Sequence, residues 1–251
     1  HPLQCAGGDQ RLGRRSQPAQ QGRDQESGDP PGEHAADPEQ VRRRAHHGAE
    51  WLAFQGGGTV VFLGLNGPAL PVALFAAGML AKPFAPLNYR LPDADLRKLL
   101  ARTAPSVAIV DDDMVARLGD TPEVTVVSRS AFEAACNGPG VSEASFDEDH
   151  DVAVLLFTSG TTGDPKAAIL RHANLTSYVI STVEFMGSEE DEAALVSVPP
   201  YHIAGISAVL TGAFSGRRIV HLEAFTPEAW VEAAAAEQIT HAMVVPTMLG
   251  R

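Results

Sequence analysis

Near its middle the sequence carries a segment rich in glycine and hydroxyl groups, which lies between two short apolar runs. The segment consists of Thr158, Ser159, Gly160, Thr161, Thr162, Gly163, Asp164, Pro165 and Lys166. The apolar run before it, residues 152–157, predicts a buried strand. Four hydroxyls and two glycines in six positions let the backbone approach a polyanion closely, and Lys166 adds a positive charge. This segment therefore indicates phosphate binding.

The segment differs from the common nucleotide-binding loop, in which Gly-Lys-Ser/Thr begins a helix. Pro165 precedes the lysine and Ala167 follows it, and residues 167–170 predict a second strand rather than a helix. We therefore expect a strand, a loop and a strand. The alternative is a flexible hairpin turn without a ligand, which the ordered string and its Pro-Lys end disfavour.

Residues 158–166 match the signature Thr-Ser-Gly-Thr-Thr-Gly-x-Pro-Lys at every fixed position. On this motif the sequence resembles the adenylate-forming enzymes, a family that includes acyl-CoA synthetases, luciferases and the adenylation domains of peptide synthetases. The resemblance continues, in the family's order, at residues 62–66, 86–91, 172–175, 199–205 and 244–247. It implies an α/β fold of mostly parallel β-sheets covered by helices, equivalent to a truncated N-terminal part of the family's large domain.

The pattern of apolar residues after residue 58 independently predicts alternating strands and helices. The predicted strands are residues 59–65, 84–87, 106–110, 124–127, 152–157, 167–170, 194–198, 218–222 and 241–245. The predicted helices are residues 68–80, 93–102, 175–185, 206–214 and 227–237. Such alternation is typical of a mostly parallel sheet with helices on both faces.

The first 57 residues have a different composition from the rest. Residues 1–50 contain seven Arg, seven Gln and seven Gly, but only Leu3, Leu12 and Val41 as large aliphatic residues. Burial of so few apolar side chains cannot offset the conformational entropy that is lost when a chain folds. We therefore expect residues 1–57 to be disordered or translated out of frame. We interpret residues 58–251 as an incomplete N-terminal AMP-binding domain.

Composition excludes several classes of protein. The net charge is −12, from 19 Lys and Arg against 31 Asp and Glu, which disfavours a nucleic-acid-binding surface. The two cysteines, Cys5 and Cys136, lie far apart and suggest neither a disulfide nor a metal site, which is consistent with a cytoplasmic location. Residues 68–80 form the longest apolar stretch, too short to cross a bilayer, so we expect no transmembrane segment.

The resemblance also implies roles for individual residues. Lys166 would contact ATP phosphate and act in catalysis, and Thr158, Ser159, Gly160, Thr161, Thr162 and Gly163 would form the rest of the phosphate site, with Thr158 also meeting Mg²⁺. His202 would lie beside the acyl carboxylate, although a lone histidine is often structural. Tyr201, Gly205 and Thr247 would line the acyl pocket. We interpret Ile206 and Met243 as core and His172 as structural, and His221 and His241 lack motif support.

By resemblance, the complete enzyme would use ATP and Mg²⁺ to convert a carboxylic acid, such as a fatty acid, to an acyl-adenylate and then to an acyl-CoA thioester. The alternatives are the adenylation domain of a peptide synthetase and a catalytically silent fragment that binds phosphate. In the family, the segments that hold ribose and adenine follow the part matched here, so we expect the 251-residue chain to be inactive alone. The sequence does not predict an oligomeric state.

Overall fold

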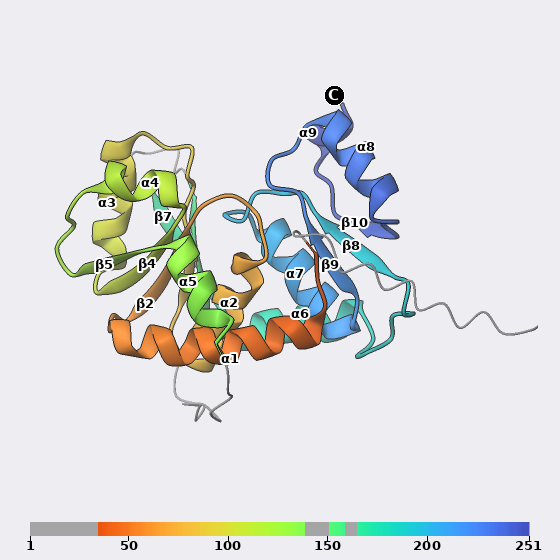
Figure 1. Cartoon of the computed structure of the whole chain (residues 1–251), viewed down its shortest axis with the longest axis horizontal. Coiled ribbons are helices and arrows are strands. Elements are labelled where there is room, and N and C mark those ends of the chain that lie inside the picture. The colour runs from red at the N-terminus through yellow and green to blue at the C-terminus, as the bar shows by residue number, and fades with distance from the viewer. Residues whose placement is uncertain (1–34, 139–150, 159–164, 251) are drawn as a thin grey trace, which may run out of the picture. The chain divides into compact units, whose positions relative to one another are not determined.

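The computed structural model describes residues 35–138, 151–158 and 165–250, which form two β-sheets and the helices around them (Figure 1). The larger sheet has six strands in the order β5-β4-β2-β3-β6-β7. Its strands are β2 (Thr59–Leu63), β3 (Phe84–Pro86), β4 (Ser106–Val110), β5 (Val124–Ser128), β6 (Val152–Thr158) and β7 (Lys166–Arg171). All neighbours in this sheet pair in parallel except β6 and β7, which are antiparallel.

The second sheet has four strands in the order β1-β9-β8-β10. These are β1 (Ala35–Ala36), β8 (Ala193–Val196), β9 (Arg218–His221) and β10 (His241–Ala242). The pairs β8·β9 and β8·β10 are parallel, whereas β1 is antiparallel to β9. The prediction of mostly parallel sheets is therefore confirmed.

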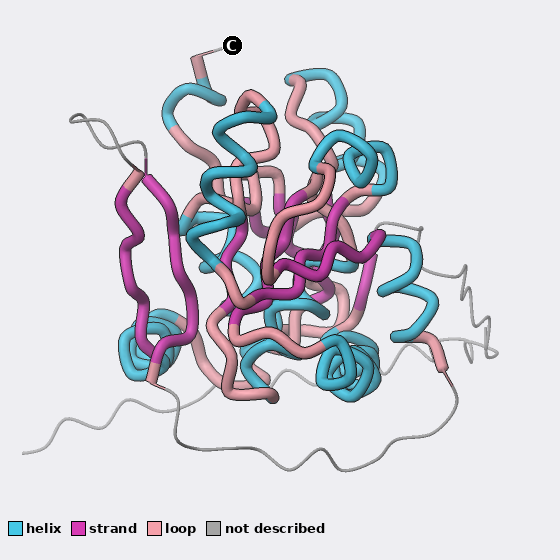
Figure 2. The backbone as a smooth tube through the Cα atoms, turned by 90° about the vertical axis from the view of Figure 1, so that its left-hand side faces the viewer, coloured by secondary structure: helices cyan, strands magenta, loops and turns pink. Residues whose placement is uncertain are grey.

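Helices cover both faces of the larger sheet (Figure 2). The alternation of side chains along its strands explains how. Val60 and Phe62 of β2 point to one face, where they pack with α1 (Pro38–Gln55), α2 (Ala69–Met79) and α5 (Arg129–Cys136). Val61 and Leu63 point to the opposite face, where they pack with α3 (Asp93–Thr103) and α4 (Asp112–Leu118). Because both faces are buried, β2 and β4 are continuous apolar runs after their first residues, Thr59 and Ser106.

The remaining helices follow strands of either sheet. They are α6 (His172–Thr182), α7 (Ile203–Ser215), α8 (Pro227–Ala236) and α9 (Pro246–Leu249). Ile206 and Val209 of α7 join the same core as Phe62, so this helix connects the cores of the two sheets. Within the described residues, no helix is both long and apolar enough to cross a membrane.

The prediction that residues 1–57 are disordered or out of frame is wrong for residues 35–55. This segment forms β1 and α1, and α1 lies alongside α2 and α5 (Figure 1). The Asp37 side chain caps α1 by accepting a hydrogen bond from Gln40 N at 2.7 Å, and Pro38 occupies the first turn. Residues 1–34 lie outside the described residues.

Small residues explain why composition concealed this helix. The buried face of α1 consists of Val41, Ala45, His46, Gly48, Ala49 and Leu52. A Cβ at Gly48 would lie 3.1 Å from Cys136 Sγ and 3.2 Å from the Phe132 ring, so glycine permits the close approach of α5. Cys136 is a free, buried thiol, and burial raises its pKa to about 12.

Several predicted boundaries also need correction. Helices α4 and α5 fall in a region for which only a strand was predicted, α6 begins at His172 rather than at 175, and α7 begins at Ile203 rather than at 206. The last predicted strand, 241–245, comprises only His241–Ala242, and the chain then turns into α9 at Pro246. Because proline lacks an N–H and favours the first helical turn, Pro246 promotes this change.

The packing of α1 predicts unequal effects for two of its large apolar residues. Leu52 is completely buried, whereas Phe54 is 89% exposed. We expect Leu52→Ala to lower the free energy of unfolding by about 2–5 kcal/mol, since it removes buried methyl groups and leaves a cavity. Phe54→Ala should change it by less than about 0.5 kcal/mol. Urea denaturation followed by circular dichroism measures both, and equal effects would contradict the packing of α1.

Candidate active site

The predicted phosphate-binding segment connects β6 to β7 at the carboxyl-terminal edge of the larger sheet. Thr158 pairs with Lys166 in the antiparallel register, and the Thr158 hydroxyl donates to the Lys166 carbonyl at 3.3 Å. The strands expected before and after this segment are therefore confirmed. The other predicted members of the phosphate site, Ser159, Gly160, Thr161, Thr162 and Gly163, lie outside the described residues.

An arginine from α3 braces the base of this hairpin. The Arg102 guanidinium donates to the Pro165 carbonyl and lies 5.6 Å from the centre of the Phe157 ring, a cation–π contact. Lys166, one residue further on, is exposed and forms no ion pair with any described residue. Arg102 therefore supports the hairpin, whereas Lys166 is a separate cation that could bind phosphate.

A second turn, which carries Tyr201 and His202, follows β8 of the smaller sheet. His202 N donates to the Pro199 carbonyl at 3.1 Å, and Gly205 N donates to the His202 carbonyl at 3.0 Å as α7 begins. A Cβ at Gly205 would lie 3.0 Å from the Pro199 carbonyl oxygen. Because a side chain would collide with this carbonyl, glycine at 205 permits the close approach of helix and turn.

Aromatic contacts bring the Tyr201–His202 turn against a turn of the larger sheet. The Tyr89 and Tyr201 rings meet edge to face at a centroid distance of 5.7 Å, and the rings of Tyr201 and His202 are 4.6 Å apart. The Arg90 guanidinium lies 5.5 Å from the centre of the Tyr89 ring. Both turns follow parallel strands, β3 and β8, at the carboxyl ends where α/β sheets bind ligands.

Partial burial and charge act together on His202. His202 is exposed as a residue, but its imidazole is partly shielded from water, which lowers its pKa, and the positive charge of Arg90 lowers the pKa further. The lowered pKa favours the neutral imidazole, in which one ring nitrogen can accept a hydrogen bond. Burial also raises the pKa of Tyr201, which keeps the phenol protonated. This part of the site presents neutral polar groups beside one exposed arginine.

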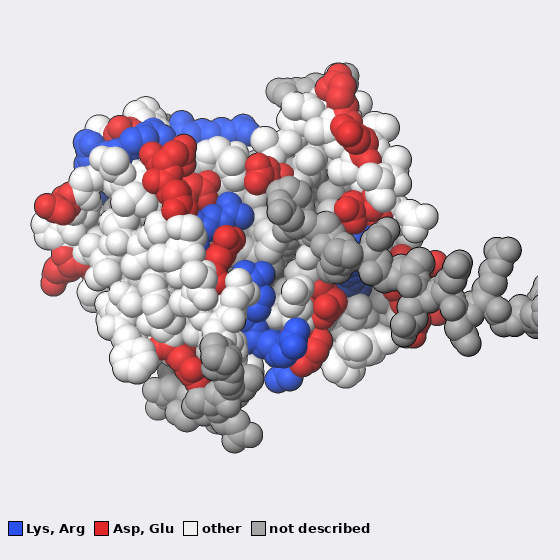
Figure 3. Space-filling view, in the orientation of Figure 1, with Lys and Arg blue, Asp and Glu red and all other residues white. Residues whose placement is uncertain are grey.

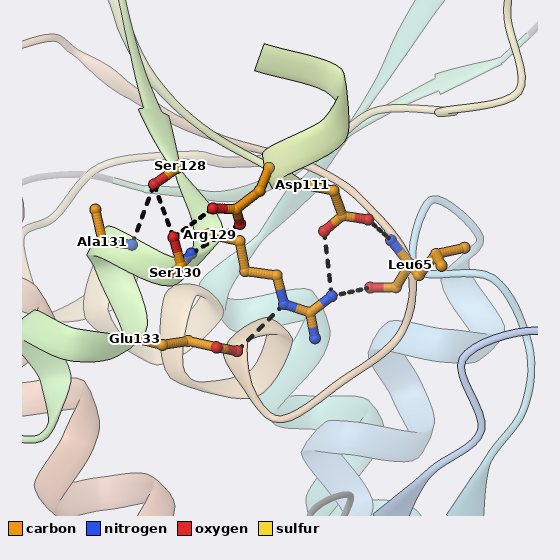
Figure 4. Close-up of polar contacts among 8 residues, drawn as sticks. Leu65, Asp111, Ser128, Arg129, Ser130, Ala131 and Glu133 are labelled. Carbon is orange, nitrogen blue, oxygen red and sulfur yellow. Dashed lines mark hydrogen bonds and ion pairs between the residues drawn. The ribbon is translucent and has the colours of Figure 1, made fainter.

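A loop that sequence reasoning missed lies at the same edge, between β2 and α2. Asp111 accepts a hydrogen bond from Leu65 N at 2.8 Å, and Arg129 Nη1 lies 3.1 Å from Asp111 Oδ1 and 3.5 Å from the Leu65 carbonyl (Figure 4). A Cβ at Gly64 would lie 2.2 Å from Asp111 Oδ1, and one at Gly67 would lie 1.7 Å from Arg129 Nη2. The glycines on either side of Leu65 and Asn66 in the sequence were a signal for a constrained turn.

The other predicted residues lie in varied environments. Ile206 is completely buried, which confirms it as core, and Met243 packs against that core. Thr247 is exposed on α9 and, among the described residues, forms no hydrogen bond with the Tyr201–His202 turn. His172 is the first residue of α6 and donates its backbone N–H to the Asp151 carbonyl at 3.0 Å.

An apolar cavity lies elsewhere, between α2, α6 and α7. Its volume is about 370 Å³, and its lining includes Phe75, Leu175, Val179, Leu210 and Phe214. Of the residues singled out from the sequence, only His172 reaches it among the described residues. The candidate site is therefore defined by the turns at the strand ends and not by this cavity.

Charged side chains of both signs are interspersed on the face shown in Figure 3. Several basic residues are paired with acids, for example Arg42 with Glu39 at 2.7 Å and Arg117 with Asp93 at 2.6 Å. The net charge of −12 gives the chain no excess of positive charge for a polyanionic strand.

Comparison with known proteins gives matches that cover most of the chain. A sequence model described as AMP-binding enzyme matches residues 39–251. Feruloyl-CoA synthase from an Amycolatopsis species is 34% identical over 215 residues, covering 82% of this chain and 42% of that protein. Indoleacetate–CoA ligase from Aromatoleum aromaticum is 31% identical over 204 residues, covering 76% of this chain and 40% of that protein.

Among solved structures, ATP-bound MatB from Rhodopseudomonas palustris superposes with a TM-score of 0.72 at 25% identity, covering 84% of this chain and 44% of that one. The chain thus spans about two fifths of the length of the relatives named here. The family match begins at residue 39, inside α1, which agrees with the packing of that helix and moves the start of the domain from the predicted residue 58.

Two helical glycines provide a test of the geometry around the His202 turn. A Cβ at Gly205 would lie 3.0 Å from the Pro199 carbonyl oxygen and 3.2 Å from that of Val198, whereas one at Gly78 would have nothing within 4 Å. We expect Gly205→Ala to lower the free energy of unfolding by about 1–3 kcal/mol through overpacking. Gly78→Ala should raise it by about 0.5–1 kcal/mol. Chemical denaturation compares the two, and a stabilising Gly205→Ala would contradict the close approach.

Proposed function

The chain belongs to the AMP-binding enzyme family, and from this premise we propose that it is part of an enzyme that activates a carboxylic acid with ATP and transfers the acyl group to CoA. The observation that supports this most strongly is the hairpin that joins Thr158 to Lys166 at the carboxyl edge of a parallel sheet. Such an edge is where α/β folds bind nucleotides. The relatives named above are CoA synthases and ligases.

For the nucleotide side, we propose that Lys166 binds the phosphates of ATP with the hydroxyls and backbone of residues 158–163. Its exposed ammonium, which forms no ion pair with a described residue, is available for this contact. Within the described residues no group of three His, Cys, Asp or Glu side chains could hold a metal ion. Mg²⁺ often binds through substrate phosphates and few protein ligands, so the Thr158 hydroxyl fits an ion that is held mainly by ATP.

For the acyl side, we propose that His202 and Tyr201 lie next to the substrate carboxylate, with Gly205 leaving room at the start of α7. A carboxylate oxygen attacks the α-phosphorus of ATP, and the bond to pyrophosphate breaks. A thiolate then attacks the acyl carbonyl, and AMP leaves. The chain's contribution to the first step is positioning and charge neutralisation, which dominate catalysis of phosphoryl and nucleotidyl transfer.

The relatives favour an aromatic acid over the fatty acid that the sequence suggested. Their names specify feruloyl and indoleacetate groups, and others specify 2-succinylbenzoate and 4-coumarate. We therefore propose a carboxylic acid with an aromatic ring as the substrate class, and a fatty acid as a second candidate. The peptide-synthetase alternative requires an amino acid substrate, which the same assay tests.

The proposal is tested with two proteins, the 251-residue chain and a chimera. In the chimera, residues 35–251 are joined to the part of feruloyl-CoA synthase that follows its matched region. We expect the chimera to catalyse acid-dependent exchange between ATP and pyrophosphate with aromatic acids, and the 251-residue chain to catalyse none. Lys166→Ala in the chimera should lower the exchange rate on the order of 10²-fold, because its charge acts on the departing pyrophosphate.

Lys98→Ala is the matched control. Lys98 is an exposed lysine of α3 paired with Asp95 at 3.5 Å, so its loss should leave exchange unchanged. A folded Lys166→Ala chimera with the parent rate would refute the role of Lys166. Exchange that depends only on amino acids would instead favour the peptide-synthetase alternative, and exchange by the 251-residue chain would refute its inactivity.

A further inference from the structure

A buried asparagine joins the two sheets beside the candidate site. Asn66 lies in the loop between β2 and α2, and only 2% of its surface is exposed. Its side-chain nitrogen donates to the Val198 carbonyl at 3.1 Å and to the Leu222 carbonyl at 3.2 Å. Since these residues follow β8 and β9, one amide of the larger sheet holds the ends of two neighbouring strands of the smaller sheet.

The contacts fix the orientation of this amide. An asparagine NH₂ has two donors, and two carbonyl oxygens face it. The opposite orientation would place Oδ1 against the same carbonyls, which cannot donate. Asn66 Oδ1 is buried and has no hydrogen-bond partner among the described residues. The two hydrogen bonds of the NH₂ group are therefore the polar contacts that hold this side chain in position.

The loop that carries Asn66 is itself held in place. The preceding residue, Leu65, is bonded through its N–H to Asp111 and through its carbonyl to Arg129, and both charged side chains are only 15% exposed (Figure 4). An Asp–Arg pair that is largely shielded from water is costly to break, because each partner would leave the other charge uncompensated. Asn66 therefore extends from a rigid anchor.

The carbonyl that Asn66 holds lies immediately before the turn that carries His202. The next residues, Pro199 and Pro200, have no N–H, so they cannot anchor the turn as donors. The turn must therefore be held through its carbonyls. The Val198 carbonyl accepts a hydrogen bond from the Asn66 amide, and its oxygen would lie 3.2 Å from a Cβ at Gly205. Moving the Val198 carbonyl would move the turn as well.

We propose that Asn66 is a positioning residue that sets the place of the His202 turn relative to the sheet that carries the Thr158–Lys166 hairpin. In a complete enzyme it would fix the acyl side of the site against the phosphate side. That catalytic consequence rests on the proposed function, whereas the positioning itself can be measured without any activity.

The test uses the titration of His202 in the 251-residue chain. The His202 imidazole signal is followed by NMR in histidine-labelled protein and assigned by its loss in His202→Gln. In the parent, partial burial and Arg90 hold the pKa of His202 below its ordinary value. The ionisable groups that face it are Arg90, Tyr89 and Tyr201. In Asn66→Ala we expect this pKa to rise towards the ordinary value for histidine, by more than the fitting error, because the freed turn loses both its partial shielding from water and its fixed place near Arg90.

Ser197→Ala is the matched control. Ser197 is also 2% exposed and adjoins Val198, but its hydroxyl accepts from Trp230 Nε1 at 3.2 Å, within the part of the chain that forms the smaller sheet. This variant loses a buried hydrogen bond without losing the link between sheets, so the pKa of His202 should stay at the parent value. Asn66→Ser, which keeps one donor, should give a smaller rise than Asn66→Ala.

Three outcomes would overturn the proposal. The first is a parental pKa of His202 in folded Asn66→Ala, and the second is an equal rise in Ser197→Ala. The third is unfolding of both Asn66 variants at 25 °C, because Asn66 would then be required for the fold and not for the position of one turn. Absence of ligase activity in the chimera would refute the proposed function but would leave the titration result unaffected.

Discussion

The parallel pairing of β2 with both β3 and β4 is the constraint on which the candidate site depends. Parallel strands end at the same edge, so the residues that follow them must lie near one another. The loop with Asn66 follows β2, the turn with Tyr89 and Arg90 follows β3, and Asp111 follows β4. Through its parallel contact with β3, β6 delivers Thr158 to this edge as well.

The smaller sheet supplies the other half of the candidate site by the same rule. Its strand β8 ends just before the Tyr201–His202 turn, and two kinds of contact hold that turn against the larger sheet. One is the donation by Asn66 to the Val198 carbonyl, and the other is the edge-to-face contact of Tyr89 with Tyr201. His202 and the exposed Lys166 thus belong to separate sheets, and their positions relative to each other depend on these contacts.

Patterns local in sequence could be predicted, and contacts distant in sequence could not. The β6–β7 hairpin was predictable because an apolar run, a glycine-rich loop and a second run are contiguous, and the family match confirms the resemblance of the segment. Helix α1 was missed because its buried face uses Ala45, Gly48 and Ala49, which a count of large aliphatic residues ignores. The bond from Asn66 to Val198 spans 132 positions, and no periodicity encodes such a pair.

The site residues show the same division. Motif resemblance singled out Lys166, Tyr201 and His202, and the structure describes each at a strand end. It gave no role to Arg102 or Arg129, because their roles depend on contacts with residues distant in sequence. Arg102, for example, donates to the carbonyl of Pro165, which is 63 positions away. The roles assigned to Lys166, Tyr201 and His202 and to residues 158–163, 205 and 247, and a cytoplasmic location, stay predictions.

The juxtaposition of the two sheets at the site is tested most directly by a double-mutant cycle between Tyr89 and Tyr201. These residues belong to turns of different sheets, and their ring centroids are 5.7 Å apart. Free energies of unfolding are measured for the parent, Tyr89→Leu, Tyr201→Leu and the double variant. If the turns meet as described, the coupling energy is about 0.5–1.5 kcal/mol in favour of the aromatic pair. Additive effects, with no coupling, would contradict a site built where the two sheets meet.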